Sequence, residues 1–341
     1  MADPALVRSQ IPWLRFAYSI YGLVLGSHEP IEILTPSLAR QHVADVELRY
    51  GAVPQTTFAG VPVLWYSSAD LEESGEPILR VWKHGAGPLF RMSYSDGAEF
   101  WLDLRARKIY AVGPPAVSRT ALELYLVGPV LGLFLRFAGA TCLHASAVHI
   151  GERAVAFVGP SGSGKSTTAA LLSKTGHSIV SDDIVVISEK SGGFYVPASC
   201  PYVSLWPASV QLLFGSPDAL PRIMSGWDKR RFPAQQAGPR NGNGDVPLGV
   251  LYILARRDAE SPSFFEPIEA RESLMTLIAN TYATGVLDRD LRSREFAAIG
   301  RLARFVPIRR AYVPRDPQQF QAFAEALQRD LLALASLEHP R

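Results

Sequence analysis

The sequence predicts an α/β fold preceded by a small β-rich domain, and three observations support this. Short apolar or alternating runs separated by turn residues fill residues 1 to about 117. Beyond that point strand-like runs alternate with helical ones, a pattern typical of α/β domains. A chain of 341 residues also exceeds the length at which one hydrophobic core stops growing. We therefore expect two domains, residues 1–117 and 118–341.

Within the first domain, strand-like runs are expected at residues 16–21, 46–50, 63–66 and 78–82. The clearest hairpin joins residues 89–94 to 99–103 through Ser95, Asp96 and Gly97, because Asp-Gly favours a tight turn with positive φ. No catalytic constellation is evident in this region. Its histidines lack the spacing of metal ligands; they are His28, His42 and His84.

In the second domain, continuous apolar runs predict buried strands at residues 154–158, 178–180, 184–187 and 248–254. Helices are expected at 165–174, 273–282, 292–303 and 317–334. The last of these carries an apolar stripe that indicates core packing, formed by Phe320, Phe323, Leu327 and Leu331. Residues 233–245 are rich in Pro, Gly, Asn and Gln and predict a mobile loop.

Composition excludes several classes of protein. The net charge of +2 argues against a polybasic nucleic-acid-binding protein. Two cysteines, Cys142 and Cys200, can form neither a disulfide framework nor a four-thiolate zinc site, so two buried reduced thiols are expected. Residues 121–143 are long and apolar enough to span a bilayer, but Glu123 and Arg136 favour a buried helix followed by a strand. Because the N-terminus also lacks signal-peptide features, we expect a cytoplasmic protein that binds neither membrane nor nucleic acid.

The strongest motif in the sequence is a nucleotide phosphate loop. Gly159, Pro160, Ser161, Gly162, Ser163, Gly164, Lys165 and Ser166 fit G-x-x-x-x-G-K-[ST] between an apolar strand and a helix, and Thr167 follows. Glycines let backbone N–H groups turn towards phosphate oxygens, and the helix adds its positive N-terminal end. Lys165 is expected to reach the β and γ phosphates, and Ser166 to bind Mg²⁺. The alternative is a glycine-rich loop without a ligand.

Two further features narrow the chemistry. Asp182 and Asp183 follow the apolar run at 178–180, where acidic side chains suit Mg²⁺ binding or removal of a proton from an attacking hydroxyl. Ser-Asp-Asp is also good turn chemistry, so a surface turn is the alternative. His144 lies just upstream of the phosphate strand, and taken alone it fits a packed core histidine. On one strand His144 and His149 would face opposite sides, which argues against a shared metal site.

Taken together, residues 143–187 resemble the HPr kinase/phosphorylase family. That family combines a histidine, a β-hairpin, a G-x-S-G-x-G-K-S loop, a helix ending in Gly-His and an Asp-Asp pair; here Gly176 and His177 supply the Gly-His pair. The likeness is looser over residues 120–335. The layout of the whole chain is also similar to HPr-kinase-like proteins encoded beside lasso-peptide precursors, which phosphorylate a serine of the precursor. Residues 205–207 and 228–230 resemble that subgroup.

The resemblance implies a phosphoenolpyruvate-carboxykinase-like kinase domain that uses ATP and Mg²⁺. It implies that Asp183 is the general base towards a serine hydroxyl and that His144 supports the reacting groups. The family's metal-binding glutamate has no counterpart, since residues 204–207 carry no acid, so the metal would fall to Ser166 and Asp182. For the family's phosphate-clamping arginine, Arg230 is a better candidate than Arg240.

These observations predict an ATP-dependent serine kinase acting on a peptide or small protein. A small-molecule kinase and a non-catalytic nucleotide-binding regulator are the alternatives. The sequence leaves open the acceptor, the choice of ATP or GTP, phosphorylase activity and whether the chain forms a homo-oligomer.

Overall fold

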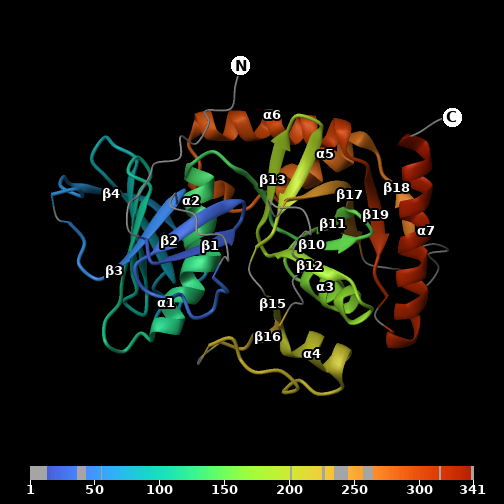
Figure 1. The fold of residues 1–341 in the computed structure, drawn as a ribbon, viewed down its shortest axis with the longest axis horizontal. Coiled ribbons are helices and arrows are strands. Elements are labelled where there is room, and N and C mark those ends of the chain that lie inside the picture. The colour runs from blue at the N-terminus through green and yellow to red at the C-terminus, as the bar shows by residue number, and fades with distance from the viewer. Residues whose placement is uncertain are drawn as a thin grey trace. The chain divides into compact units, whose positions relative to one another are not determined.

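The computed structural model describes residues 14–36, 44–54, 56–199, 202–224, 227–233, 245–255, 264–314 and 316–338. The chain divides into two compact units (Figure 1). Unit 1 comprises residues 1–139 and 283–288, and unit 2 comprises residues 140–282 and 289–341. The predicted mobile loop at 233–245 lies almost entirely outside the described residues, as does Cys200; Cys142 is a buried free thiol.

Unit 1 contains one eight-stranded sheet, in the order β1-β2-β3-β8-β7-β6-β5-β4. Its strands are β1 (Phe16–Ile20), β2 (Leu23–Ser27), β3 (Val46–Tyr50), β4 (Pro62–Ser67), β5 (Leu79–His84), β6 (Leu89–Tyr94), β7 (Glu99–Asp103) and β8 (Lys108–Val112). The predicted hairpin is confirmed: β6 pairs antiparallel with β7, and Gly97 has the positive φ of +89° that the turn requires. The β-rich character of this region is therefore confirmed.

The apolar segment after the sheet forms a buried helical stretch made of α1 (Arg119–Tyr125), η1 (Leu126–Val130) and α2 (Leu131–Phe137). Among the described residues it is the one helical stretch long and apolar enough to cross a membrane, and 83% of it is buried inside the protein. Its aromatic side chains stack on the sheet, with Phe137 on Phe90 at 4.0 Å and Tyr125 on Tyr94 at 4.1 Å between ring centroids. The prediction of a buried helix followed by a strand is confirmed.

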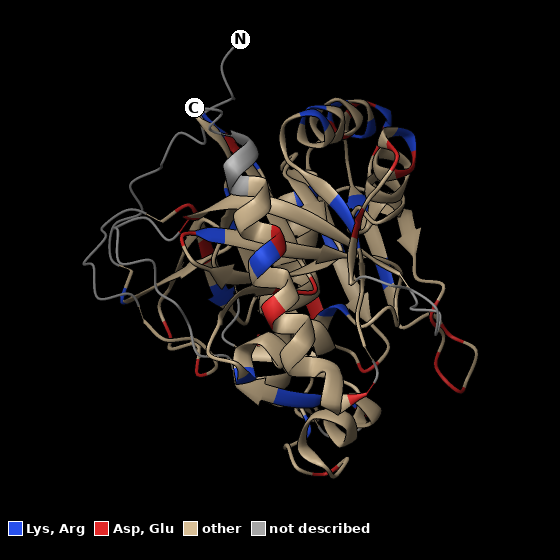
Figure 2. Cartoon of the chain, turned by 90° about the vertical axis from the view of Figure 1, so that its right-hand side faces the viewer, with Lys and Arg blue, Asp and Glu red and all other residues tan. Residues whose placement is uncertain are grey.

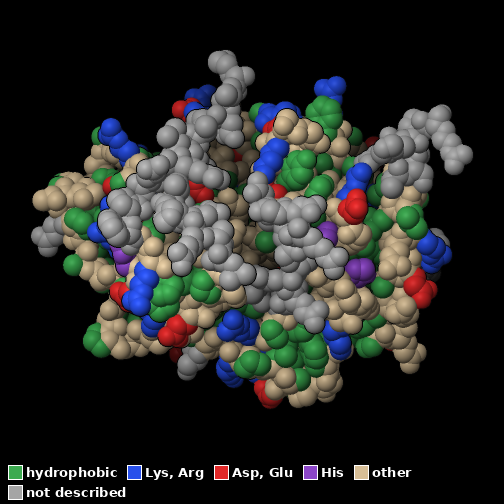
Figure 3. All heavy atoms as spheres, viewed as in Figure 1, with side chains coloured by type: hydrophobic (Ala, Val, Ile, Leu, Met, Phe, Trp, Pro, Cys, Tyr) green, Lys and Arg blue, Asp and Glu red, His purple; other side chains and the backbone are tan. Residues whose placement is uncertain are grey.

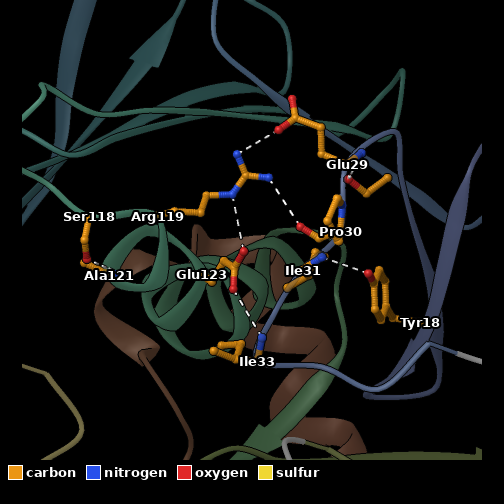
Figure 4. Close-up of polar contacts among 10 residues, drawn as sticks. Tyr18, Glu29, Pro30, Ile31, Ile33, Ser118, Arg119, Ala121 and Glu123 are labelled. Atoms are coloured by element: carbon orange, nitrogen blue, oxygen red, sulfur yellow. Dashed lines mark hydrogen bonds and ion pairs between the residues drawn. The ribbon is translucent and has the colours of Figure 1, made fainter.

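Polar contacts also join α1 to the first unit (Figure 4). Ser118 caps the helix by accepting a hydrogen bond from the N–H of Ala121. The fully buried carboxylate of Glu123 accepts hydrogen bonds from the N–H of Ile33 at 3.2 Å and from Nε of Arg119 at 3.3 Å. A helix bonded in this way belongs with the sheet.

The boundary between the units therefore lies at residue 139 and not at the predicted residue 117. The Pro-Pro pair near residue 115 ends a strand, but the helical stretch that follows still packs on that strand's own sheet. A second difference is that residues 283–288 return to unit 1, where the carbonyl of Val286 accepts a hydrogen bond from Nε1 of Trp65 at 2.7 Å. Sequence pattern alone gives no signal for this return.

Unit 2 contains a mixed sheet in the order β12-β10-β11-β17-β14-β13-β9, to which β19 and β18 are added beside β17. Its strands are β9 (Thr141–Leu143), β10 (Ala145–Ile150), β11 (Arg153–Val158), β12 (Ser178–Asp182), β13 (Val185–Lys190), β14 (Gly193–Pro197), β17 (Asp245–Ala255), β18 (Phe265–Pro267) and β19 (Ile308–Tyr312). The central strands β11, β17 and β19 are parallel. Of these, β11 and β17 are the buried core strands that the continuous apolar runs at 154–158 and 248–254 predict.

Helices cover both faces of this sheet. They are α3 (Lys165–Lys174), α5 (Ala270–Ala279), α6 (Arg289–Phe305) and α7 (Phe320–Glu338), the last preceded by the short turn η3 (Pro317–Gln319). One core cluster joins α3 and α7 to alternate residues of β11, including Val155 and Phe157; the other joins α5 and α6 to Ala154, Ala156 and Val158. Figure 2 looks onto α7. Its predicted apolar stripe is confirmed, since Phe323 and Leu327 are buried in the first cluster and Phe320 and Leu331 pack against it.

A separate two-stranded ribbon completes unit 2. It pairs β15 (Tyr202–Leu205) with β16 (Arg230–Pro233) and leads from β15 into α4 (Pro207–Phe214). Val203 and Leu205 on one side of the ribbon are buried in the core that contains α3. The ribbon is thereby held beside the helix that follows the phosphate loop.

Candidate functional site

The segment at 159–164 joins the end of β11 to the first residue of α3. Gly162 and Gly164 have φ of +77° and +99°, a region that side chains disfavour. A Cβ on Gly159 would lie 2.8 Å from Oγ and 3.2 Å from Cβ of Ser163, so a larger residue here would force Ser163 to move. The strand, loop and helix that the motif requires are therefore all present.

Two polar atoms of this loop indicate its ligand. Nζ of Lys165 is buried and donates to the carbonyls of Gly159 at 2.8 Å and Pro160 at 3.0 Å. Burial lowers the pKa of Lys165, and the nearby carboxylates of Asp183 and Asp182 partly oppose this shift. Oγ of Ser163 is buried with no hydrogen-bond partner. Because buried hydroxyls are normally paired, this atom fits a phosphate oxygen as its partner.

Asp182 ends β12 as a buried carboxylate surrounded by hydroxyl groups. Its Oδ1 accepts from Oγ of Ser146 at 2.6 Å, and its Oδ2 accepts from the N–H of Ser204 at 3.2 Å. The hydroxyl of Ser166 also donates to it. Burial raises the pKa of Asp182, and the neighbouring charge of Asp183 adds to the increase despite these hydrogen bonds. Burial thus disfavours the charged form of Asp182, and a divalent cation bound beside Ser166 would stabilise that form.

Asp183 lies just beyond the strand, in a tight turn. Its φ of +68° is left-handed, and the turn is closed by the N–H of Ile184 donating to the carbonyl of Asp182 at 2.8 Å. Aspartate tolerates this conformation better than most residues. The two aspartates therefore differ in direction because of the turn and not because of strand alternation. The side chain of Asp183 is 53% exposed, whereas Asp182 is buried.

His144 lies beside Asp183. It sits between β9 and β10, where its N–H donates to the carbonyl of Asn280 at 2.8 Å. Its Nε2 is 3.1 Å from Oδ1 of Asp183. Surrounding protein atoms oppose ionisation of Asp183, but the hydrogen bond and charge of His144, followed by Lys229 and Lys165, outweigh them and hold its pKa below the usual range. This arrangement keeps an accessible carboxylate ionised.

Arg230, predicted to clamp phosphate, is engaged elsewhere. Its guanidinium is buried and donates to Oδ1 of Asp218 and to the carbonyl of Asp228, each at 2.7 Å. It points into the buried side of the ribbon and stabilises the segment that returns from α4. The cation whose charge acts on both Asp183 and Lys165 is its neighbour Lys229. Strand alternation separates the two residues, and the sequence did not show which of them faces the site.

The stretch that lacks the expected glutamate does lie beside Asp182. Ser204 contributes a backbone N–H there in place of a carboxylate. In the described part of the chain, no group of three or more His, Cys, Asp or Glu side chains is placed to hold a metal ion. Ser166 and Asp182 lie side by side there, joined by the hydrogen bond from the serine hydroxyl. Thr167 instead bonds to the hydroxyl of Ser209 on α4 at 2.8 Å.

Sequence reasoning missed Ser146, Ser204 and Lys229. Ser146 had a detectable signal, since it is the polar residue within the otherwise apolar run at 145–148 of β10, and the structure buries it fully. Ser204 acts through its backbone, which no residue type reveals.

No protein-family model matches the sequence, and no curated protein matches it. Among solved structures, the fold is similar to the Hpr(Ser) kinase/phosphatase from Coxiella burnetii, with a TM-score of 0.32 and 13% identity over 58% of this chain and 94% of that one. A likeness of this size does not assign an activity. The structure itself shows a mixed α/β fold in which Lys165, Ser166, Asp182, Asp183 and His144 come together.

Proposed function

We propose that the protein is an ATP-dependent kinase that transfers a phosphoryl group to a serine hydroxyl of a peptide or small protein. The observation that carries the proposal is the Asp183–His144 pair. It presents a half-exposed carboxylate whose pKa burial would raise but His144 lowers, with smaller contributions from Lys229 and from Lys165 of the phosphate loop. A general base needs this combination of access to the acceptor and closeness to the transferring group.

The other residues take complementary roles. Backbone N–H groups of the loop and the N-terminal end of α3 bind phosphate, and Lys165 exchanges its carbonyl partners for phosphate oxygens. Ser166 and Asp182 would hold Mg²⁺, which when bound neutralises charge on the phosphates. Ser146 and the N–H of Ser204 orient the Asp182 carboxylate.

In the transfer step, the serine oxygen forms a bond to the γ-phosphorus while the bond to the β,γ-bridging oxygen breaks and ADP departs with that electron pair. The hydroxyl proton passes to the carboxylate of Asp183. His144 lies 3.1 Å from that carboxylate through Nε2 and holds it in place before transfer. Lys165 and Lys229 offset negative charge around the transferring group.

The resemblance of residues 143–187 to HPr-kinase-like enzymes makes a lasso-precursor peptide the first acceptor to test. We also propose that the protein acts in the cytoplasm, without membrane or nucleic acid as partner. A nucleotide-binding regulator is favoured by one observation: across the residues that the structure describes, no group of three or more His, Cys, Asp or Glu side chains could hold a metal ion.

The test is incubation with γ-labelled ATP, Mg²⁺ and serine-containing peptides, each paired with its Ser→Ala version, followed by mass spectrometry. We expect label on the serine of at least one peptide. Tight ATP binding with no transfer to any peptide would instead indicate the regulator. Transfer to a small metabolite alone would indicate the small-molecule kinase.

A further inference from the structure

The β15–β16 ribbon has two unlike faces. Val203 and Leu205 point into the core, whereas the alternate residues point outward, and the register pairs Ser204 with Arg231. On the outward side the guanidinium of Arg231 lies 5.0 Å from the ring centroid of Tyr202, and Nζ of Lys229 lies 5.3 Å from that of Trp206. We define the ribbon face as Tyr202, Ser204, Trp206, Lys229 and Arg231. It alternates aromatic rings and cations.

The charge on this face is not neutralised. Among the described residues, neither Lys229 nor Arg231 has a carboxylate within ion-pair distance, whereas their neighbours Arg230 and Arg222 pair with Asp218 and Asp228. The ring of Trp206 is 54% exposed although it is large and apolar. In Figure 3, hydrophobic and basic side chains gather where Figure 1 places β16 and α4. An exposed tryptophan beside cations that lack a carboxylate partner is typical of a recognition surface.

The ribbon face adjoins the reacting groups. The backbone of Ser204, at its centre, donates to the carboxylate of Asp182 at 3.2 Å. The charge of Lys229, at one end, lowers the pKa of Asp183. Arg231 and Tyr202 lie further along the ribbon. A molecule bound along this face would therefore have one part at the carboxylate of Asp183 and the rest on Arg231 and Tyr202.

We propose that the ribbon face binds the acceptor and selects an extended peptide segment with acidic residues beside its serine. This inference rests on the proposed kinase function and names its substrate class. Alternate residues of a strand are about 6.6 Å apart, so the face spans roughly 13 Å, the length of about four extended residues. That span exceeds what a small metabolite needs. Two unpaired cations fit acidic side chains, and the rings of Tyr202 and Trp206 supply flat apolar contacts.

The test measures binding separately from transfer. Fluorescein-labelled peptides with one serine flanked by Asp, by Asn or by Lys are titrated with the protein, together with Mg²⁺ and a non-hydrolysable ATP analogue, and anisotropy gives Kd. We expect the Asp-flanked peptide to bind most tightly and to weaken as salt rises. Arg231→Glu should weaken it about 3- to 10-fold and should improve binding of the Lys-flanked peptide, because the sign of the complementary charge is reversed.

The matched control is Arg304→Glu, which also reverses an arginine beside an aromatic ring, that of Phe305 on α6. It should leave the preference unchanged. If circular dichroism shows that Arg231→Glu is misfolded, Arg231→Gln replaces it, with loss of the acidic preference as the expected result.

The outcomes separate this inference from the kinase proposal. If peptides bind in a charge-dependent way but are not phosphorylated, the kinase proposal is wrong, whereas the proposal that the ribbon face binds peptide is supported. Transfer that ignores flanking charge, with Arg231→Glu unaffected, would overturn the ribbon face alone. The inference also fails if Arg231→Glu weakens binding of a fluorescent ATP analogue as much as that of peptide, or if a single-stranded oligonucleotide binds as tightly as the Asp-flanked peptide.

Discussion

Nε2 of His144 lies 3.1 Å from Oδ1 of Asp183, and separate backbone hydrogen bonds fix each of the two residues. The carbonyl of Asn280 holds the backbone of His144, and the turn closed by Ile184 holds Asp183. The pair is therefore built by the fold and does not depend on a flexible loop finding its partner.

Replacing His144 by glutamine should change the pH profile of transfer. In the wild type the pKa of Asp183 is below its ordinary value, so the base is ionised at every pH above about 4 and no acidic limb is expected there. Without the charge of His144 that pKa rises. As the pH is lowered, kcat/KM should therefore begin to fall at a higher pH in the variant than in the wild type. Profiles of kcat/KM between pH 4.5 and 8 measure the difference. Identical profiles would show that His144 does not act through Asp183.

Asp183→Asn should slow transfer by about 10²–10⁴-fold, the usual value of positioned proton transfer, while ATP affinity changes little. Asp182→Asn should instead raise the Mg²⁺ concentration required. Turnover measured against Mg²⁺ for both variants separates the roles. Rescue of the Asp183 variant, and not the Asp182 variant, by excess Mg²⁺ would reverse the assignment.

Lys165→Ala should reduce phosphoryl transfer by at least about 10²-fold, because Lys165 offsets charge on the transferring group, and ATP binding should also weaken. The control is Lys190→Ala, which removes an exposed lysine paired with Asp245 on a surface edge and should keep full activity. Filter-binding and label-transfer assays measure both quantities. A fully active Lys165 variant would show that residues 159–166 do not form the catalytic phosphate site.

Gly159→Ala should weaken nucleotide binding while unit 2 stays folded, since the added methyl group would lie 2.8 Å from Oγ of Ser163 and force that side chain to move. The double variant Gly159→Ala, Ser163→Ala should recover part of the binding, because the clashing oxygen is gone. Calorimetric titration with ATP and Mg²⁺ compares the two. If the single variant binds as the wild type does, the loop does not need the close fold-back seen here.

Glu123→Ala should destabilise unit 1 by about 1–3 kcal/mol, because it leaves the buried N–H of Ile33 unpaired and removes one partner of Arg119, which keeps its ion pair with Glu29. Glu123→Gln should cost less. Burial raises the pKa of Glu123, so the wild type loses stability as pH rises from the ordinary value towards the raised one, and the glutamine variant should lack this loss. Urea unfolding followed by tryptophan fluorescence between pH 4 and 8 tests both; equal slopes would contradict the second expectation.

The sequence predicted the elements that are determined by residues close together in the chain. The helix at residues 165–174 and the 89–103 hairpin follow from glycine positions and apolar periodicity, and both are present. The direction of Asp183 depends on a left-handed turn, and the choice between Lys229 and Arg230 depends on which side of β16 faces the core. Residue type alone predicts neither of these two features. The boundary at 139 was missed because the apolar residues of a helix indicate that it is buried, but they do not indicate which sheet it packs against.

The six residues 283–288 have a bearing on synthesis at the ribosome. Trp65 finds the Val286 carbonyl only after the chain has been translated far beyond the first sheet. At about 5–20 residues per second, the interval between residue 139 and residue 288 lasts roughly 10–30 s. During that time unit 1 exists without its last strip of chain, and the buried side chains of Val286 and Leu287 have not yet reached it. The nascent protein therefore completes the folding of its first unit late. A chaperone could bind the incompletely folded unit during this interval.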